Sequence, residues 1–185
     1  MIILTPVFIL ISLAIKCTSK GPIFFKQKRI GLYGKEFTLY KFRTMKEGAE
    51  KETAGKYITG NEGVLTPVGK FLRRWALEEL PQLFNVLKGD MSIVGPRPAL
   101  PYQVERYNEH QRKRLEMKPG LTGWAQVNGR NKLTWPERIE YDVWYAENWS
   151  LWLDFKIMLM TIPALLRKDF AFADENKITD GLVEL

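Results

Sequence analysis

The sequence predicts a helix-rich α/β domain with a few short strands, which associates with one side of a membrane through a re-entrant N-terminal segment and interfacial amphipathic helices. The chain has 185 residues, 45% of them hydrophobic and 26% charged, a composition typical of one folded domain. Short β-rich runs and longer helical patterns alternate along its middle. Apolar segments near both ends are too short or too interrupted to cross a bilayer.

Residues 2–15 form the most apolar segment, interrupted only by Thr5, Pro6 and Ser12. A helix of this length reaches about 21 Å, whereas a bilayer core is about 30 Å thick. We expect Pro6 to break the helix, so that the segment dips into the membrane and turns back. Periodicity leaves one alternative open, a buried first helix of a soluble core.

Positive charge is concentrated directly after this segment. The net charge of the chain is +7, and a single acid, Glu36, lies within residues 16–46. The basic residues there are Lys16, Lys20, Lys26, Lys28, Arg29, Lys35, Lys41, Arg43 and Lys46. Beside an apolar insertion, such residues favour the cytoplasmic face and attract anionic lipids by about 1 kcal/mol each. A nucleic-acid surface is the competing interpretation, but no nucleic-acid motif accompanies the charge, so we expect no nucleic-acid partner.

The middle of the chain begins with two predicted strands, residues 23–25 and 37–40, which flank a glycine-bearing turn at residues 31–34. After a polar loop over residues 47–63, residues 67–75 predict a helix with Phe71, Leu72 and Trp75 on one face.

A second helix is predicted over residues 80–88, because Pro81 suits a first helical turn and Gly89 suits a stop. Near the other end, the Trp-rich segment 144–168 is interrupted by Asp154, Lys156 and Pro163. It predicts a helix lying in the membrane interface, or alternatively a core helix with stacked aromatic rings.

The helix at residues 80–88 places two carboxylates, Glu78 and Glu79, at its amino end. Acidic groups there are stabilised by free N–H groups, and a divalent metal could bridge them to a pyrophosphate. Ordinary enrichment of acids in a first turn is the alternative. Arg97 lies between two prolines, which fix the backbone on both sides and favour oxyanion binding, unless the segment is a simple turn. Residues 118–130 carry glycines and donors that suit a loop around a nucleotide or a sugar.

The chain contains one cysteine, Cys17, and one histidine, His110. A single cysteine excludes an internal disulfide. With only one cysteine and one histidine, the usual zinc sites and the Ser-His or Cys-His catalytic relays are hard to assemble. Any catalysis is therefore expected to use carboxylates, Lys and Arg.

Several blocks together resemble the bacterial sugar transferases, the monotopic polyprenyl-phosphate phosphoglycosyl transferases. The resemblance covers nearly the whole chain and rests on residues 21–27, 41–45, 80–98 and 119–130. It implies transfer of sugar 1-phosphate from a UDP-sugar to undecaprenyl phosphate, with release of UMP and with Mg²⁺ as cofactor. It also implies a location at the cytoplasmic face of the bacterial inner membrane, with membrane lipids as partners; a homodimer is left open.

The resemblance also assigns roles to residues. Glu78 matches the nucleophile that attacks the β-phosphate to form a covalent phosphosugar-enzyme, and Glu79 matches its acidic neighbour; both are the expected Mg²⁺ ligands. Arg97 is expected to bind phosphate. Further phosphate candidates are Arg73, Lys41 and Arg43, and the candidate nucleotide-sugar residues are Gly123, Gln126, Asn128 and Arg130.

Two departures from the family pattern define the alternative. Most relatives have Asp at the position of Glu78, and an added methylene moves the attacking oxygen by more than the roughly 0.5 Å that catalysis tolerates. The competing hypothesis is an inactive or weak membrane relative that binds glycolipid precursors or scaffolds glycan assembly. The front is also shorter than in relatives, so we expect a truncated membrane-inserting segment at 1–20, a catalytic domain at 21–168 and a tail at 169–185.

Overall fold

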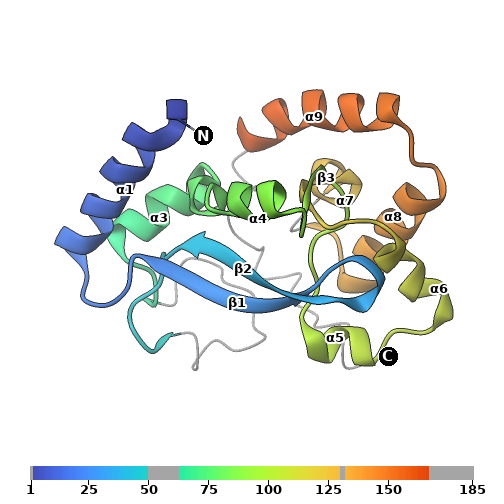
Figure 1. Ribbon diagram of the computed structural model, residues 1–185, viewed down its shortest axis with the longest axis horizontal. Helices are drawn as coiled ribbons and strands as arrows, with labels where there is room; N and C mark the ends of the chain where they lie inside the picture. The colour runs from blue at the N-terminus through green and yellow to red at the C-terminus, as the bar shows by residue number, and fades with distance from the viewer. Residues whose placement is uncertain (1, 50–62, 130–131, 167–185) are drawn as a thin grey trace.

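A computed structural model of the chain describes residues 2–49, 63–129 and 132–166. Their arrangement is helix-rich α/β, as predicted, with two small two-stranded sheets (Figure 1). An antiparallel hairpin, β1–β2, lies along one side of the domain, and α4 packs against β2. Helices α1 and α3 lie toward one end of the hairpin, and α7, α8 and α9 lie toward the other. Most of the predicted loop at 47–63 and the tail at 169–185 lie outside the described residues.

The N-terminal apolar segment forms one helix, α1 (Thr5–Thr18), preceded by a 3-10 turn, η1 (Ile2–Leu4). Pro6 lies in the first turn of α1, where a missing N–H costs nothing, so both sides of it are helical. The expected break at Pro6 is therefore not seen within residues 2–18. Ile11 and Ile15 are buried against Phe42, while other apolar residues of α1 stay exposed.

The hairpin consists of β1 (Phe24–Ile30) and β2 (Glu36–Phe42), joined by the turn η2 (Leu32–Gly34). Its register pairs Phe24 with Phe42 and Ile30 with Glu36. Both predicted strands are confirmed, and the turn falls where glycines allow it: Gly34 has a φ of 80°.

The two central helices are confirmed with small shifts of boundary. Helix α3 (Pro67–Arg74) is capped by Thr66, whose hydroxyl accepts from the N–H of Gly69 at 2.9 Å. Helix α4 (Gln82–Lys88) ends at Gly89, which has a φ of 83°. The three residues predicted to share one face of α3 differ in burial. Leu72 is buried, but Phe71 and Trp75 are exposed.

The second sheet, a parallel pair, was not predicted. Strand β3 (Ser92–Val94) pairs with β4 (Gly120–Thr122), and α5 (Pro101–Glu105), α6 (Glu109–Arg112) and η4 (Lys113–Glu116) lie between them in sequence. The backbones approach closely because Gly95, Gly120 and Gly123 meet. A Cβ on Gly123 would lie 2.1 Å from the carbonyl oxygen of Gly95. These glycines are therefore required for packing.

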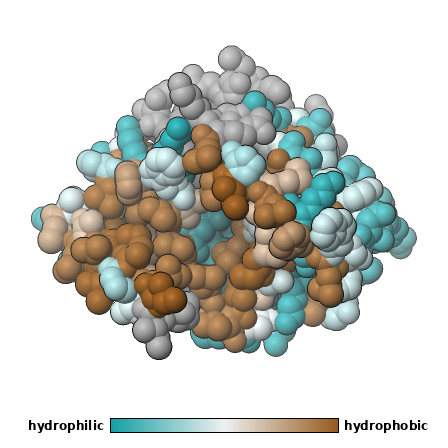
Figure 2. Space-filling model, turned by 90° about the horizontal axis from the view of Figure 1, so that it is seen from above, coloured by the Kyte–Doolittle hydropathy of each residue, from teal (hydrophilic) through white to brown (hydrophobic). Residues whose placement is uncertain are grey.

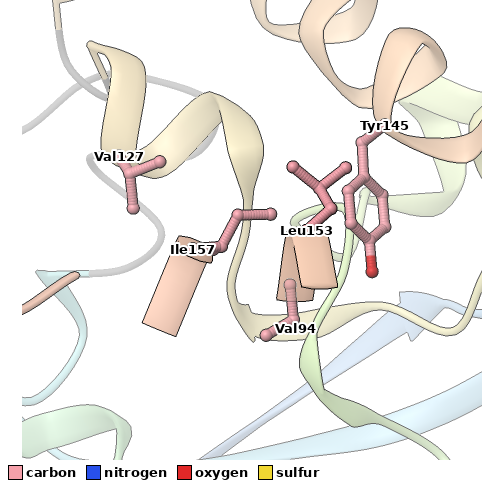
Figure 3. Close-up of a cluster of buried hydrophobic side chains, with 5 residues drawn as sticks. All are labelled: Val94, Val127, Tyr145, Leu153 and Ile157. Atoms are coloured by element: carbon pink, nitrogen blue, oxygen red, sulfur yellow. The ribbon is translucent and has the colours of Figure 1, made fainter. Parts of the chain in front are cut away.

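Three helices complete the domain: α7 (Trp124–Asn128), α8 (Trp135–Glu147) and α9 (Leu151–Leu166). Their contact with β3 forms a core cluster of Val94, Val127, Tyr145, Leu153 and Ile157 (Figure 3). Helix α9 contributes Leu153 and Ile157 to this cluster, and most of its other apolar residues are exposed. Among the described helices, none combines the length and apolar character needed to cross a bilayer.

Candidate active site

The two adjacent carboxylates lie on a 3-10 turn, η3 (Leu77–Glu79), between α3 and α4. Ala76 precedes them with a φ of 53°, a left-handed conformation that separates this turn from α3. Glu78 and Glu79 are therefore one turn ahead of α4, close to the helix start predicted for them. Each is only 8% exposed, and burying two adjacent acids requires nearby compensation.

Compensation for Glu79 comes from two distant segments. Its Oε1 lies 3.2 Å from Nζ of Lys41 on β2, and 3.3 and 3.2 Å from Nη1 and Nη2 of Arg97, in the loop after β3. The structure thus brings together the acidic pair, the proline-flanked arginine and one of the further phosphate candidates. We call Glu78, Glu79, Lys41 and Arg97 the charged cluster.

The cations of the charged cluster repel one another. The pKa of Lys41 is lowered to about 8, chiefly by burial; Glu79 opposes this shift, and repulsion from Arg97 contributes to it. Burial, followed by repulsion from Arg97, also lowers the pKa of Arg29 to about 10. Arg29 was noted only as part of the basic segment, but it adds a third cation near Glu79. An incoming anion would relieve this repulsion, so the arrangement suits a phosphate or pyrophosphate.

The other two phosphate candidates make structural contacts. Both terminal nitrogens of buried Arg43 donate to the segment after α1, to the carbonyls of Lys20 and Ser19. Arg43 therefore holds the segment after α1, and a contact with phosphate stays a prediction. Nε of Arg73 donates to the hydroxyl of Thr44 at 3.1 Å.

The predicted nucleotide-sugar loop is largely the short helix α7. Gly123 precedes α7 and serves close packing, and the side-chain amide of Asn128 donates to the carbonyl of Trp124 at 2.8 Å. Gln126 differs from both: it is 7% exposed, and neither amide atom has a hydrogen-bond partner in the described part of the chain. Of the three candidates that the structure describes, Gln126 is the one suited to a ligand. Arg130 lies outside the described residues.

The donor chemistry of Glu78 and Glu79 fits Mg²⁺ when phosphate oxygens are added. Over the described ranges, the chain has no cluster of three or more His, Cys, Asp or Glu side chains suited to a metal. Mg²⁺ does not need one, because it keeps several waters and is usually held by one or two carboxylates together with substrate phosphates. The carboxylate pair therefore meets the protein's share of such a site.

Comparison with known proteins identifies the family. Residues 1–168 match the family profile described as "Bacterial sugar transferase". The chain belongs to the bacterial sugar transferase family. This membership agrees with the motifs noted in the sequence, several of which meet at the charged cluster.

Relatives differ in how much of their length the chain covers. The "Uncharacterized sugar transferase EpsL" of Bacillus subtilis is 50% identical over 163 residues, which are 88% of this chain and 79% of the relative. The "UDP-glucose:undecaprenyl-phosphate glucose-1-phosphate transferase" of Xanthomonas campestris is 44% identical over 91% of this chain, but the match covers 37% of that protein. The "Undecaprenyl-phosphate galactose phosphotransferase" of Salmonella typhimurium is 41% identical over 82% of this chain and 35% of its own length.

The charged cluster generates a prediction about the titration of Lys41. Its ammonium group should lose its proton near pH 8, because burial and Arg97 disfavour the charged form. Arg97→Ala should raise this pKa by removing a like charge, and Glu79→Gln should lower it by removing an opposite one. The pKa is measured from the ¹³Cε shifts of labelled lysines.

Lys113 provides the matched control, because its hydrogen bond to Glu147 raises its pKa instead. Neither substitution should move its titration. If Lys41 and Lys113 had the same pKa, the cluster would not be arranged as described. The same would follow if the pKa of Lys41 moved in the opposite direction in either variant.

Proposed function

We propose that this protein transfers a sugar 1-phosphate from a UDP-sugar to undecaprenyl phosphate, giving UMP and undecaprenyl-diphosphate-sugar. The observation that supports this most directly is the charged cluster, in which a buried acidic pair meets two cations from separate segments. The names of the Xanthomonas and Salmonella relatives describe this class of reaction. The chain spans little more than a third of those two proteins. The family profile, which matches residues 1–168, covers the charged cluster.

In the proposed first step, a carboxylate oxygen of Glu78 attacks the β-phosphorus of the UDP-sugar. A bond forms between this oxygen and phosphorus, and the bond from the β-phosphorus to the bridging oxygen breaks, so that UMP leaves with the bridging oxygen. In the second step, an oxygen of undecaprenyl phosphate attacks the same phosphorus and releases the Glu78 carboxylate. No net proton is needed in either displacement.

The contacts of Glu79 fit its proposed role as the acidic neighbour of the nucleophile. One oxygen of Glu79 accepts from both Lys41 and Arg97. Such charge-assisted bonds stabilise the negative charge and reduce nucleophilicity, so Glu79 is better suited to orienting the cations.

Charge neutralisation and positioning supply most of the catalysis in phosphoryl transfer. The planar guanidinium of Arg97 is suited to bind pyrophosphate oxygens, and its side chain is 36% exposed, so a ligand can reach it. Lys41 supplies a nearby point charge, and the buried amide of Gln126 is proposed to bind the nucleotide or sugar. Mg²⁺ bound by Glu78 and Glu79 would add Lewis-acid neutralisation of the phosphate charge.

The lipid substrate requires the charged cluster to be reachable from a membrane. Exposed apolar residues of α1, α4 and α9 form what we call the apolar face: Ile9, Leu10, Leu13, Phe84, Leu87, Trp152, Phe155, Leu159 and Ile162. Figure 2 shows apolar side chains gathered on this side of the molecule, with hydrophilic groups in a hollow between them. Phe8 on α1 contacts Phe84 on α4 edge to face, with ring centroids 5.8 Å apart.

The position of the acidic turn links the chemistry to this face. Helix α4 begins directly after η3, so Phe84 and Leu87 follow Glu79 within about two helical turns. We therefore propose that the apolar face enters the cytoplasmic leaflet of the inner membrane. The basic residues after α1 would then meet anionic headgroups.

Substitution of the proposed nucleophile tests the reaction. In detergent with Mg²⁺, a UDP-sugar and undecaprenyl phosphate, the wild-type protein should release UMP, and Glu78→Ala should reduce the rate at least a thousandfold, about 4 kcal/mol of lost transition-state stabilisation. The control is Glu140→Gln, which changes a carboxylate whose side chain is 60% exposed and should keep the wild-type rate.

Two outcomes would contradict the proposal in different ways. A Glu78→Ala protein that retains most of its activity would show that Glu78 is not the nucleophile. Binding of UDP-sugars without release of UMP by the wild-type protein would instead favour the non-enzymatic alternative, a relative that binds precursors or scaffolds glycan assembly.

The membrane proposal has its own test. Leu10→Glu on α1 and Ile162→Glu on α9 each place a charge on the apolar face, where the wild-type side chains are 67% and 62% exposed. Each should reduce flotation of the protein with liposomes of anionic and zwitterionic lipid several-fold, because charge insertion costs about 2–3 kcal/mol. Tyr33→Glu is the control: Tyr33 is 78% exposed in the β1–β2 turn. Equal loss of flotation in all three variants would contradict the assigned face.

A further inference from the structure

The loop that carries Arg97 is held at four consecutive carbonyl groups. The carbonyl of Pro96 accepts from the N–H of Gly120 at 2.9 Å, and that of Ala99 accepts from the N–H of Ile30 at 2.9 Å. Between them, two arginine side chains act as donors. Nη2 of Arg114 lies 2.9 Å from the carbonyl oxygen of Arg97 itself, and Nη1 of Arg29 lies 3.0 Å from that of Pro98.

These four contacts use the acceptor groups of a loop in which two prolines lack backbone donors. Pro96 and Pro98 have no N–H groups, so the loop offers mainly acceptors to its surroundings. Gly120 and Ile30 belong to strands and donate backbone N–H groups outside the regular strand pairs; Ile30 and Ala99 form an isolated antiparallel bridge. The two arginines are different, because each extends a long cationic side chain, buried for Arg114 and half-buried for Arg29, to reach one carbonyl.

Both terminal nitrogens of Arg114 are held by hydrogen bonds. It is 2% exposed and donates to buried Asp142 and to the hydroxyl of Tyr107, the latter at 2.5 Å. Its guanidinium also lies 5.6 Å from the ring centroid of Tyr107 and 5.7 Å from that of Trp135. A guanidinium held in this way has one orientation available, and that orientation directs Nη2 at the carbonyl of Arg97.

Stability alone does not explain the Arg114–Asp142 pair. Desolvation of two buried charges cancels most of their attraction, and apolar replacements of similar volume are often equally stable. Here burial raises the pKa of Asp142 despite its arginine partner. Oδ1 of Asp142 and Nε of Arg114 also have no hydrogen-bond partner in the described part of the chain. What the pair does provide is a rigid donor beneath Arg97.

We propose that Arg114, oriented by Asp142, and Arg29 are positioning residues that hold the Arg97 loop so that its guanidinium meets the pyrophosphate. This inference rests on the proposed function, in which Arg97 binds the transferred phosphate. Catalytic groups must be held to within roughly 0.5 Å, and a displaced loop loses transition-state contacts before it loses the fold.

A double-mutant cycle tests the proposal through UMP release. Arg114→Met/Asp142→Leu removes both charges, so no buried charge is left alone, and its unfolding temperature should stay close to that of the wild type. Its kcat should fall about tenfold or more, the effect of losing one hydrogen bond from a charged donor. In the Arg97→Ala background, the same double substitution should change kcat by less than about twofold, because the guanidinium that the pair is proposed to position is already gone.

Matched variants keep the test decisive. Tyr107→Phe removes one further hydrogen bond of Arg114 but leaves the orienting bond to Asp142, so kcat should stay unchanged. If the double variant does not fold, Arg29→Met replaces it in the same cycle, with the same expected pattern. Losses that multiply in the Arg97→Ala background, or an unchanged kcat with Arg97 present, would overturn the proposal.

One readout is independent of activity. The backbone N–H order parameter of Arg97 should be that of a rigid segment in the wild type and should fall in the double variant but not in Tyr107→Phe. Absence of UMP release by the wild-type protein would reject the proposed function, and this measurement would still decide whether the pair positions the loop. An order parameter that does not change would reject the positioning role.

Discussion

The site depends on the Glu79 carboxylate, which shares one oxygen between Lys41 and Arg97. Two cations brought this close are unfavourable without an anion, and a buried acid is unfavourable without cations, so each stabilises the position of the other. The contact also joins strand β2, the turn η3 and the loop after β3, which are distant in the sequence. Local backbone geometry contributes as well, because the left-handed Ala76 separates the acidic turn from α3.

The same turn connects charge chemistry with an apolar surface. It is followed directly by α4, whose exposed Phe84 and Leu87 belong to the apolar face together with residues of α1 and α9. An enzyme that joins a water-soluble sugar nucleotide to a lipid phosphate needs this proximity, since its substrates arrive from different phases. Two arginines donate to the Arg97 loop: Arg29, which precedes it in the sequence, and Arg114, which follows it. We propose that these bonds give the site a rigidity that the acidic turn does not have by itself.

Local signals were sufficient for part of this structure. Pro81 and Gly89 mark the ends of α4 because capping depends on a few adjacent residues, and the β1–β2 hairpin follows from two β-rich runs around glycines. Non-local features had no such signal. The β3–β4 pair joins segments more than twenty residues apart, and its glycines resemble loop glycines in sequence, since flexibility and close packing require the same residue. The Arg114–Asp142 pair likewise has no local pattern. Phe71, Leu72 and Trp75 were placed on one helix face, but amphipathic periodicity does not say which residues of such a face the core will cover, and only Leu72 is buried.

Mass spectrometry of the protein after brief exposure to a UDP-sugar and Mg²⁺, without undecaprenyl phosphate, tests the central claim most directly. The account predicts one equivalent of UMP per protein, a mass increase equal to a sugar phosphate on the peptide that contains Glu78, and loss of that adduct when undecaprenyl phosphate is added. Release of UMP only when the lipid phosphate is present, with no adduct on this peptide, would contradict it.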